Sequence, residues 1–211
     1  MQNNTSKMVI LLGKIRKQMN GAVLDTFRYY GDKYGMNYGV AIHSVRQMAA
    51  EQGVDHDLAQ FLYRQQVREL QIIALWIADA SCVDSSQLNF WGEGIINSEL
   101  AEQAAQALLC NISDVEHLLD SWCASKSELL CYAALLAAAR SGRVGEDVAM
   151  RAVVTAATHF ANNHLAAKGL ITFIGAQIDR DKKVAERLIA ALPDSATANA
   201  VREEVEWRLE Y

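Results

Sequence analysis

Three segments of the chain open in the same way at intervals of about thirty residues, and this repeat constrains the fold more than any other feature. Arg68-Glu69-Leu70, Ser98-Glu99-Leu100 and Ser127-Glu128-Leu129 each begin a long apolar run. The steps of 30 and 29 residues correspond to one helix-turn-helix unit each. Because such units bury their apolar faces against their neighbours, the period predicts a helical-repeat array whose working surface is the inner wall made by every second helix.

Composition and capping patterns favour an all-α chain. The 211 residues contain a single proline, Pro193, and proline interrupts helices. Ser113 and Ser125 each stand three residues before a glutamate, as in a capping box, and Asp55 precedes another predicted helix. We therefore predict one domain over residues 1–211: a curved array of twelve to thirteen helices with one concave face. The helices are expected near residues 6–19, 21–34, 39–53, 55–64, 66–80, 85–94, 97–110, 113–124, 126–141, 145–161, 163–178, 181–192 and 195–210.

The width of the apolar stripe separates inner from outer helices. Leu70–Ala78 and Leu129–Ala139 are apolar nearly all round, which is typical of helices sandwiched between neighbours. The helices near residues 55–64 and 113–124 carry narrower stripes, so we expect them in the outer row.

The net charge of −5 is distributed unevenly along the chain. Residues 1–68 have a charge of +4, residues 126–211 are neutral, and residues 69–125 contain nine Asp and Glu but no Lys or Arg. Because phosphate binding depends on Lys and Arg, we expect the acidic middle third to repel nucleic acid and the flanks to hold any anion. The acidic surface could instead bind a protein partner with a basic surface. The anion-binding candidates are Arg46, Arg68, Arg140, Arg143, Lys182 and Lys183.

Three segments also resemble a known family. Met36–Glu51 (MNYGVAIHSVRQMAAE), Val67–Asp79 (VRELQIIALWIAD) and Ser98–Leu109 (SELAEQAAQALL) resemble the bacterial DNA alkylation repair (AlkD-like) family. Its members are HEAT-like helical repeat proteins, and the active ones are glycosylases that excise alkylated purines. The resemblance covers residues 8–180 and implies the HEAT-like fold, with a closer likeness to shorter members that lack the active-site residues.

The resemblance also allows the active-site positions to be compared. Active members carry a tryptophan and an aspartate on the helix that here begins near Asn97, and an arginine on the next inner helix. The corresponding residues of this chain are Leu100, Ala104 and Cys131. All three functional residues are replaced, which implies a protein without glycosylase activity. The alternative is a shifted alignment in which Glu99 or Glu102 becomes the supporting carboxylate.

Aromatic residues could line a groove that stacks a base or holds a flexible peptide. Trp91 and Trp122 flank the helix near residues 97–110, and the resemblance places Tyr30 where the family often has a cleft aromatic. The competing interpretation is that Trp76, Trp91 and Trp122 pack between helices, as tryptophan at helical spacing commonly does.

Other chemistries find no support in the pattern. His159 and His164 are too far apart around a helix to bind one metal. None of the four cysteines forms a C-x-x-C pair, so we expect reduced thiols. We therefore expect no metal and no cofactor. No apolar stretch reaches the length of a membrane span, and no signal peptide is evident, so we expect a cytoplasmic protein.

Two functional hypotheses follow. The first is a non-catalytic scaffold that uses its concave face to bind a protein or modified nucleic acid, including duplex or damaged DNA. The second is a divergent alkylpurine DNA glycosylase that uses Glu99 or Glu102. The enzyme requires a carboxylate that points into the groove beside an aromatic ring, with Lys or Arg on both rims.

Overall fold

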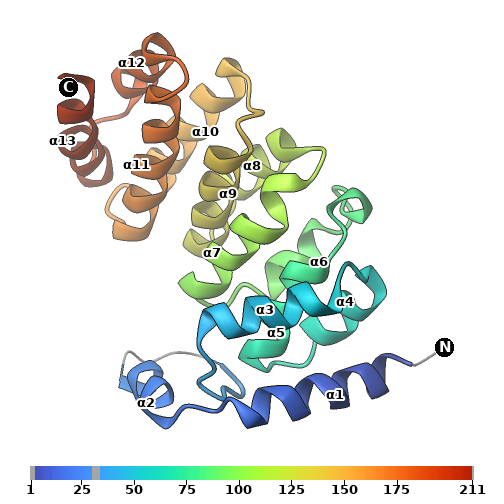
Figure 1. The fold of residues 1–211 in the computed structure, drawn as a ribbon. Helices are drawn as coiled ribbons and strands as arrows, with labels where there is room; N and C mark the ends of the chain where they lie inside the picture. The colour runs from blue at the N-terminus through green and yellow to red at the C-terminus, as the bar shows by residue number, and fades with distance from the viewer. Residues whose placement is uncertain (1–2, 30–33, 211) are drawn as a thin grey trace.

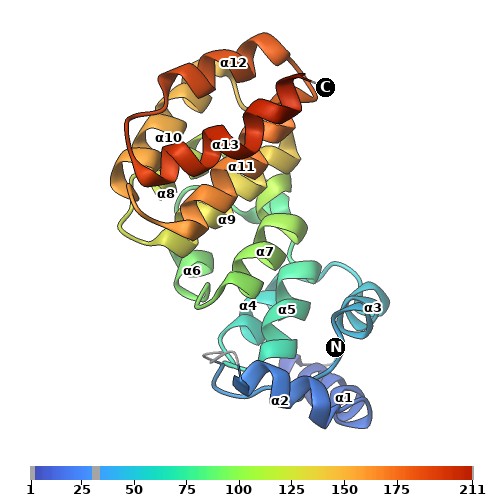
Figure 2. The same cartoon turned by 90° about the vertical axis from the view of Figure 1, so that its left-hand side faces the viewer.

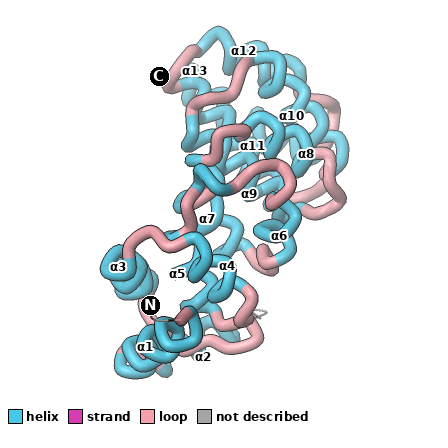
Figure 3. The backbone as a smooth tube through the Cα atoms, turned by 90° about the vertical axis from the view of Figure 1, so that its right-hand side faces the viewer, coloured by secondary structure: helices cyan, strands magenta, loops and turns pink. Residues whose placement is uncertain are grey.

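The chain folds into a curved array of helices (Figure 1) in the computed structural model, which describes residues 3–29 and 34–210. Within these ranges there are thirteen α-helices, two short 3-10 helices and no strand (Figure 3). The α-helices are α1 (Asn4–Lys17), α2 (Gly21–Tyr29), α3 (Ile42–Gln52), α4 (His56–Tyr63), α5 (Arg68–Ile77), α6 (Leu88–Glu93), α7 (Ser98–Ala107), α8 (Val115–Cys123), α9 (Glu128–Ser141), α10 (Glu146–His159), α11 (His164–Ile178), α12 (Lys182–Ala191) and α13 (Ala196–Glu210). The 3-10 helices are η1 (Ala80–Cys82) and η2 (Leu109–Asn111). The predicted all-α array is confirmed, with a helix at each expected place.

The helices form two rows. In the inner row α5, α7, α9 and α11 pack in succession, and α13 lies across α11 at the C-terminal end (Figure 2). Helices α4, α8, α10 and α12 cover the inner row from outside. Both α5 and α9 are buried nearly all round, because α5 packs against α3, α4 and α7, and α9 packs against α7, α8 and α11. The prediction of inner and outer helices is confirmed.

The repeated triplet opens the inner helices α5, α7 and α9, and its glutamate joins one repeat to another. Glu69 accepts hydrogen bonds from the main chain before α3, Glu99 pairs with Arg68, and Glu128 accepts from the side chain of Asn163. A carboxylate is also favourable in the first turn of a helix because the N-terminal end of the helix dipole is positive. The sequence period therefore marks structural ties along one edge of the array.

The caps of two helices differ from the prediction. Asp114 caps α8 and Ser127 caps α9, one and two residues beyond the predicted Ser113 and Ser125. The hydroxyl of Ser125 instead donates to the carbonyl of Trp122 at the end of α8. The apolar stripes that face the core set where these helices begin, and the capping side chain nearest that point takes the role.

Candidate functional site

A hollow of about 460 Å³ lies on the concave face, across α7, α9 and α11. Three of the side chains that line it are alanines, whose small size leaves this space open. The polar side chains of Glu102 and Arg140 stand among them, and Leu136 adds an apolar surface. The hollow, called the concave hollow below, is lined by Glu102, Ala105, Gln106, Leu136, Ala139, Arg140, Thr172 and Ala176.

A row of three polar side chains crosses the same face. Tyr132 Oη donates to Glu102 Oε1 at 2.8 Å, and Lys168 Nζ donates to the same oxygen at 2.9 Å. Lys168 Nζ also lies 5.2 Å from the centre of the Tyr132 ring. The Tyr132 hydroxyl and the Glu102 carboxylate raise the pKa of Lys168 to about 12, and burial raises the pKa of Tyr132. Glu102 therefore faces the groove as a carboxylate that is already neutralised by an ammonium group.

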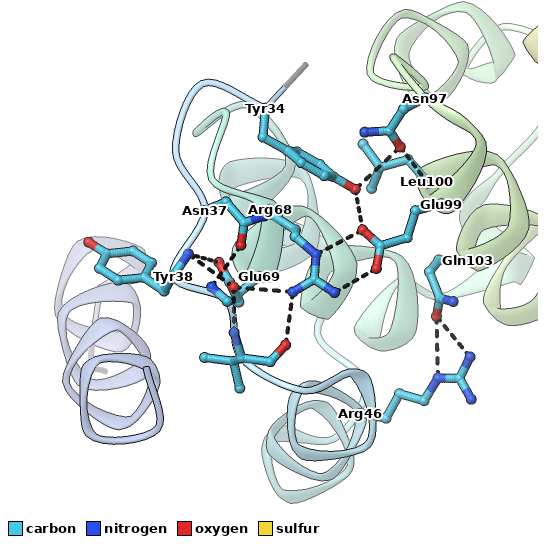
Figure 4. Close-up of polar contacts among 12 residues, drawn as sticks. Tyr34, Asn37, Tyr38, Arg46, Arg68, Glu69, Asn97, Glu99, Leu100 and Gln103 are labelled. Carbon is cyan, nitrogen blue, oxygen red and sulfur yellow. Dashed lines mark hydrogen bonds and ion pairs between the residues drawn. The ribbon is translucent and has the colours of Figure 1, made fainter. Parts of the chain in front are cut away.

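The second candidate carboxylate, Glu99, belongs to a buried network (Figure 4). Arg68 Nε and Nη2 donate to its two oxygens at 2.8 and 2.5 Å, and Tyr34 Oη donates to Oε2 at 2.6 Å. Arg68 is only 2% exposed and also donates to Glu69 Oε1 and to the carbonyl of Val40. We therefore remove Glu99 from the candidate catalytic groups and Arg68 from the anion-binding candidates, because each already neutralises the other.

The pKa shifts in this network agree with its burial. Burial raises the pKa of Tyr34, and the adjacent Glu99 carboxylate raises it further. Burial by itself would lower the pKa of Arg68, but the hydrogen bonds and charge of Glu99 outweigh it, so the pKa is raised. Tyr34 thus stays protonated and Arg68 stays charged, which fixes the role of each as a donor.

The aromatic candidates do not line the concave face. Trp91 is fully buried and its ring packs against His56, Tyr63 and Phe90. Trp122 is 4% exposed and borders a separate hollow of about 180 Å³ among α6, α8 and the start of α9. Both are packing residues, which corrects the groove assignment. The third candidate, Tyr30, lies outside the described residues.

Trp76 and Arg46 lie on the inner side of the array, where α3, α5 and α7 meet. The Arg46 guanidinium is 4.9 Å from the centre of the Trp76 ring and donates to the side-chain oxygens of Gln103 and Gln106. Trp76 Nε1 also donates to Gln103. Gln106, which accepts from Arg46, lines the concave hollow. Arg46 therefore remains an anion-binding candidate, on the side of the hollow nearer the N-terminal helices.

The remaining basic candidates gather where α9 and α11 end. Arg140 and Arg143 are exposed, and Arg143 Nη2 donates to the carbonyls of Cys110 and Ile112. Arg180 donates to the carbonyl of Ala139. Lys182 and Lys183 begin the outer helix α12, and Lys182 Nζ donates to the carbonyl of Leu209 in α13. We call Arg140, Arg143, Arg180, Lys182 and Lys183 the basic edge.

The basic edge differs from the rest of the chain in its pairing. In the part of the chain that the structure describes, the basic-edge residues donate to main-chain carbonyls or make no ion pair with a carboxylate. Basic residues elsewhere are commonly paired with carboxylates, namely Lys7–Asp55, Lys14–Glu51, Arg68–Glu99, Arg151–Asp120, Lys168–Glu102, Arg187–Glu146 and Arg208–Glu204. No carboxylate among the described residues thus forms an ion pair with this edge, although Asp179 and Asp181 lie beside it in the sequence.

Most carboxylates of the acidic middle third do not line the concave hollow. Of its nine Asp and Glu residues, only Glu102 lines the concave hollow. Asp114 caps the outer helix α8, Glu116 accepts from the main-chain N–H of Gly145, and Asp120 pairs with an arginine of α10. These three side chains serve as caps and ties on the outer row, whereas Glu69 and Glu99 pair with Arg68. The expectation that the acidic third repels phosphate stays a prediction.

Two further observations concern metals and membranes. Among the described residues, no group of three or more His, Cys, Asp or Glu is placed to hold a metal ion. No helix in the described ranges combines the length and apolar character needed to cross a membrane.

The arrangement of helices matches a solved structure. That structure represents a family of proteins related to the HEAT-like repeat DNA glycosylases with affinity for branched DNA structures. The match has a TM-score of 0.71 and covers 94% of each chain, at 15% sequence identity. The chain has a HEAT-like repeat fold. This confirms the fold that the sequence resemblance implies, although no family model and no curated protein matches the sequence.

Sequence reasoning missed part of the concave surface of this HEAT-like repeat protein. Tyr132 and Leu136 were not singled out, yet Tyr132 donates to Glu102 and Leu136 lines the concave hollow. Counting from the N-cap of each inner helix would have found these residues. Glu102, Tyr132 and Lys168 are the fifth residues after the N-caps of α7, α9 and α11, respectively. The ninth residues, four positions further along the same face, are Gln106, Leu136 and Thr172, and all three line the concave hollow.

Proposed function

We propose that this HEAT-like repeat protein is a non-catalytic scaffold that binds nucleic acid along its concave face. The observation that carries the proposal is the basic edge, which borders the concave hollow at Arg140 and has no carboxylate partner among the described residues. Neutralising phosphates with Lys and Arg supplies essentially all of non-specific nucleic-acid affinity. The proposal is further supported because most carboxylates of the acidic third do not line the hollow.

The concave hollow offers complementary surfaces for such a polymer. Its alanines and Leu136 provide an apolar floor for sugar or base faces, while Arg140 stands at the basic edge. Arg46 reaches the same wall from α3, so cations lie toward both sides of the floor. Contacts of this kind position a backbone without reading its sequence. We therefore expect the scaffold to recognise shape and charge rather than a base sequence.

A non-catalytic role is favoured by the positions that the resemblance assigns to catalysis. Leu100, Ala104 and Cys131 are all buried, so none of them reaches the groove. The Glu99 carboxylate already forms an ion pair with Arg68. A glycosylase would have to use another group.

One observation keeps the enzyme as a second candidate. Glu102 is 43% exposed on the concave face and accepts a hydrogen bond from the hydroxyl of Tyr132, but Tyr132 is only 1% exposed and offers no ring face to a base. Its pairing with Lys168 weakens the negative charge that would support an oxocarbenium ion. Release of an alkylated base from duplex that disappears in Glu102→Gln would favour this second candidate; we expect no release from the wild-type protein.

A protein partner with a basic surface is less well supported. The acidic side chains of the middle third that could attract it, such as Asp114, Glu116 and Asp120, already accept hydrogen bonds within the chain. Such a partner would dock on the outer row rather than on the concave face.

Fluorescence anisotropy tests the scaffold directly. Labelled four-way junctions and linear duplexes are titrated at about 50 mM and about 200 mM salt, a range over which phosphate contacts weaken steeply. The junction is included because the structural neighbour belongs to a family with affinity for branched DNA. We expect saturable binding at low salt that weakens as salt rises. No binding to either probe at low salt would refute the proposal.

A further inference from the structure

A bowl of about 530 Å³ opens at the C-terminal end of α9, beside the concave hollow. The bowl is formed by the end of α9 and the adjacent η2. Its lining contains two arginines and no carboxylate, and every lining side chain is polar or a thiol. The bowl is lined by Cys110, Asn111, Arg140, Ser141 and Arg143.

The arginines around the bowl are held in place by main-chain carbonyls. Arg143 Nη2 donates to Cys110 O at 3.0 Å and to Ile112 O at 2.7 Å. Arg180 donates to Ala139 O at 2.5 Å and packs against Gly142, where a Cβ would lie 2.9 Å from its guanidinium carbon. The last carbonyls of a helix otherwise leave a partial negative charge. Here Arg180 satisfies the carbonyl of Ala139 and the Gly142 N–H that of Ala138, which reduces the repulsion that an anion meets at the end of α9.

Arg140 completes the positive wall. It is exposed in the last turn of α9 and lines both the bowl and the concave hollow. Its guanidinium lies next to the Cys110 thiol, whose pKa is raised by burial and lowered in part by this charge. No described carboxylate forms an ion pair with Arg140. The chain therefore keeps two guanidinium groups facing one hollow without a counter-charge.

We propose that the bowl is a seat for a single phosphate group. The forked donors of a guanidinium group match the geometry of phosphate oxygens, and two arginines line this bowl, of which Arg143 already uses Nη2 on main-chain carbonyls. The Asn111 amide, which has a second N–H besides the one donated to Ala107 O, supplies a further polar group at its wall, whereas the Ser141 hydroxyl already donates to the carbonyl of Ala138. The phosphate belongs either to a nucleic-acid backbone or to a free phosphorylated molecule, and the first source rests on the proposed scaffold function.

The seat is tested with inorganic phosphate alone. Amide and arginine side-chain NMR signals are followed during titration with phosphate, against chloride at matched ionic strength. We expect saturable shifts confined to residues 110–112 and 139–143. The variant Arg140→Gln should bind phosphate about tenfold more weakly, because a charge-assisted hydrogen bond is lost.

The control is Arg16→Gln, which removes the same charge from an exposed position on α1, away from the bowl. It should bind phosphate as the wild type does. Since Arg140 holds no main-chain carbonyl in the described structure, its replacement leaves the fold intact. Shifts that fail to saturate, or equal affinity in Arg140→Gln and wild type, overturn the seat.

A second arm identifies the source of the phosphate. Four-way junctions are titrated against the wild type and Arg140→Gln. Weaker junction binding by the variant supports a backbone phosphate in the seat. Equal binding by both proteins removes the seat from nucleic-acid binding and leaves the scaffold standing. Saturable inorganic phosphate without any junction binding supports the seat for a small phosphorylated ligand and refutes the scaffold.

Discussion

Replacing Arg68 by methionine should destabilise the fold strongly. The substitution leaves Glu69 fully buried without its cation, holding only the N–H groups of Tyr38 and Val40. It also leaves Glu99 with Tyr34 as its principal donor. Removing one partner of a buried ion pair costs about 3–5 kcal/mol, and we expect about 3 kcal/mol here because Glu69 keeps its main-chain hydrogen bonds. Urea unfolding followed by circular dichroism measures the change in the free energy of unfolding.

The matched control is Arg151→Met. Arg151 pairs with Asp120 on the outer row, where the two side chains are 59% and 39% exposed. Exposed pairs of this kind contribute about 0–1 kcal/mol, so this variant should remain close to wild type. If Arg68→Met loses less than about 1 kcal/mol, or no more than Arg151→Met, the assignment of Arg68 as a structural residue is refuted.

Two further predictions concern local structure. Burial opposes ionisation of Asp55, but hydrogen bonds from Lys7 and the Leu58 N–H lower its pKa below the ordinary 3.8. The ionised Asp55 carboxylate therefore stabilises the folded state above pH 3.8, and this contribution is lost as pH falls through the lowered pKa. Asp55→Ala should lower the free energy of unfolding by about 1 kcal/mol at pH 7. The difference from wild type should shrink in acid when the free energy of unfolding is measured as a function of pH. An undiminished difference at low pH would contradict this. Gly94→Ala places a Cβ 2.3 Å from the Tyr63 ring and should lower the free energy of unfolding by about 1–3 kcal/mol. Gly13 lies within α1, and a Cβ there would meet no atom within 4 Å. Gly13→Ala should therefore stabilise the protein by up to about 1 kcal/mol. Thermal unfolding compares the two, and equal changes would contradict the packing at Gly94.

Local patterns were sufficient to predict the array. The x-Glu-Leu triplets mark the starts of α5, α7 and α9, and the width of the apolar stripe distinguished inner helices from outer ones. Asp55 caps α4 as its position before an apolar run predicted. These features depend on residues within one or two turns of each other, so they are visible in sequence.

The pairing of side chains across repeats was not visible in the same way. Arg68 and Glu99 are 31 residues apart and looked like separate functional candidates. The sequence does not show whether a charged side chain is buried, so their pairing could not be predicted. The row of Tyr132 and Lys168 was hidden for a related reason. The N-caps Ser127 and Asn163 are separated by a longer step than the preceding ones, so the triplet period does not place Lys168 beside Tyr132.

The central claim, that nucleic acid lies along the concave hollow, is tested most directly by a matched pair of charge insertions. Leu136→Glu places a carboxylate on the floor of the hollow, and Val154→Glu places the same charge on the outer helix α10 at a site that is 36% exposed. Four-way junction affinity is measured by anisotropy for both variants after circular dichroism confirms their fold. We expect binding at least about tenfold weaker for Leu136→Glu and unchanged for Val154→Glu. Equal affinity in the two variants would contradict the account.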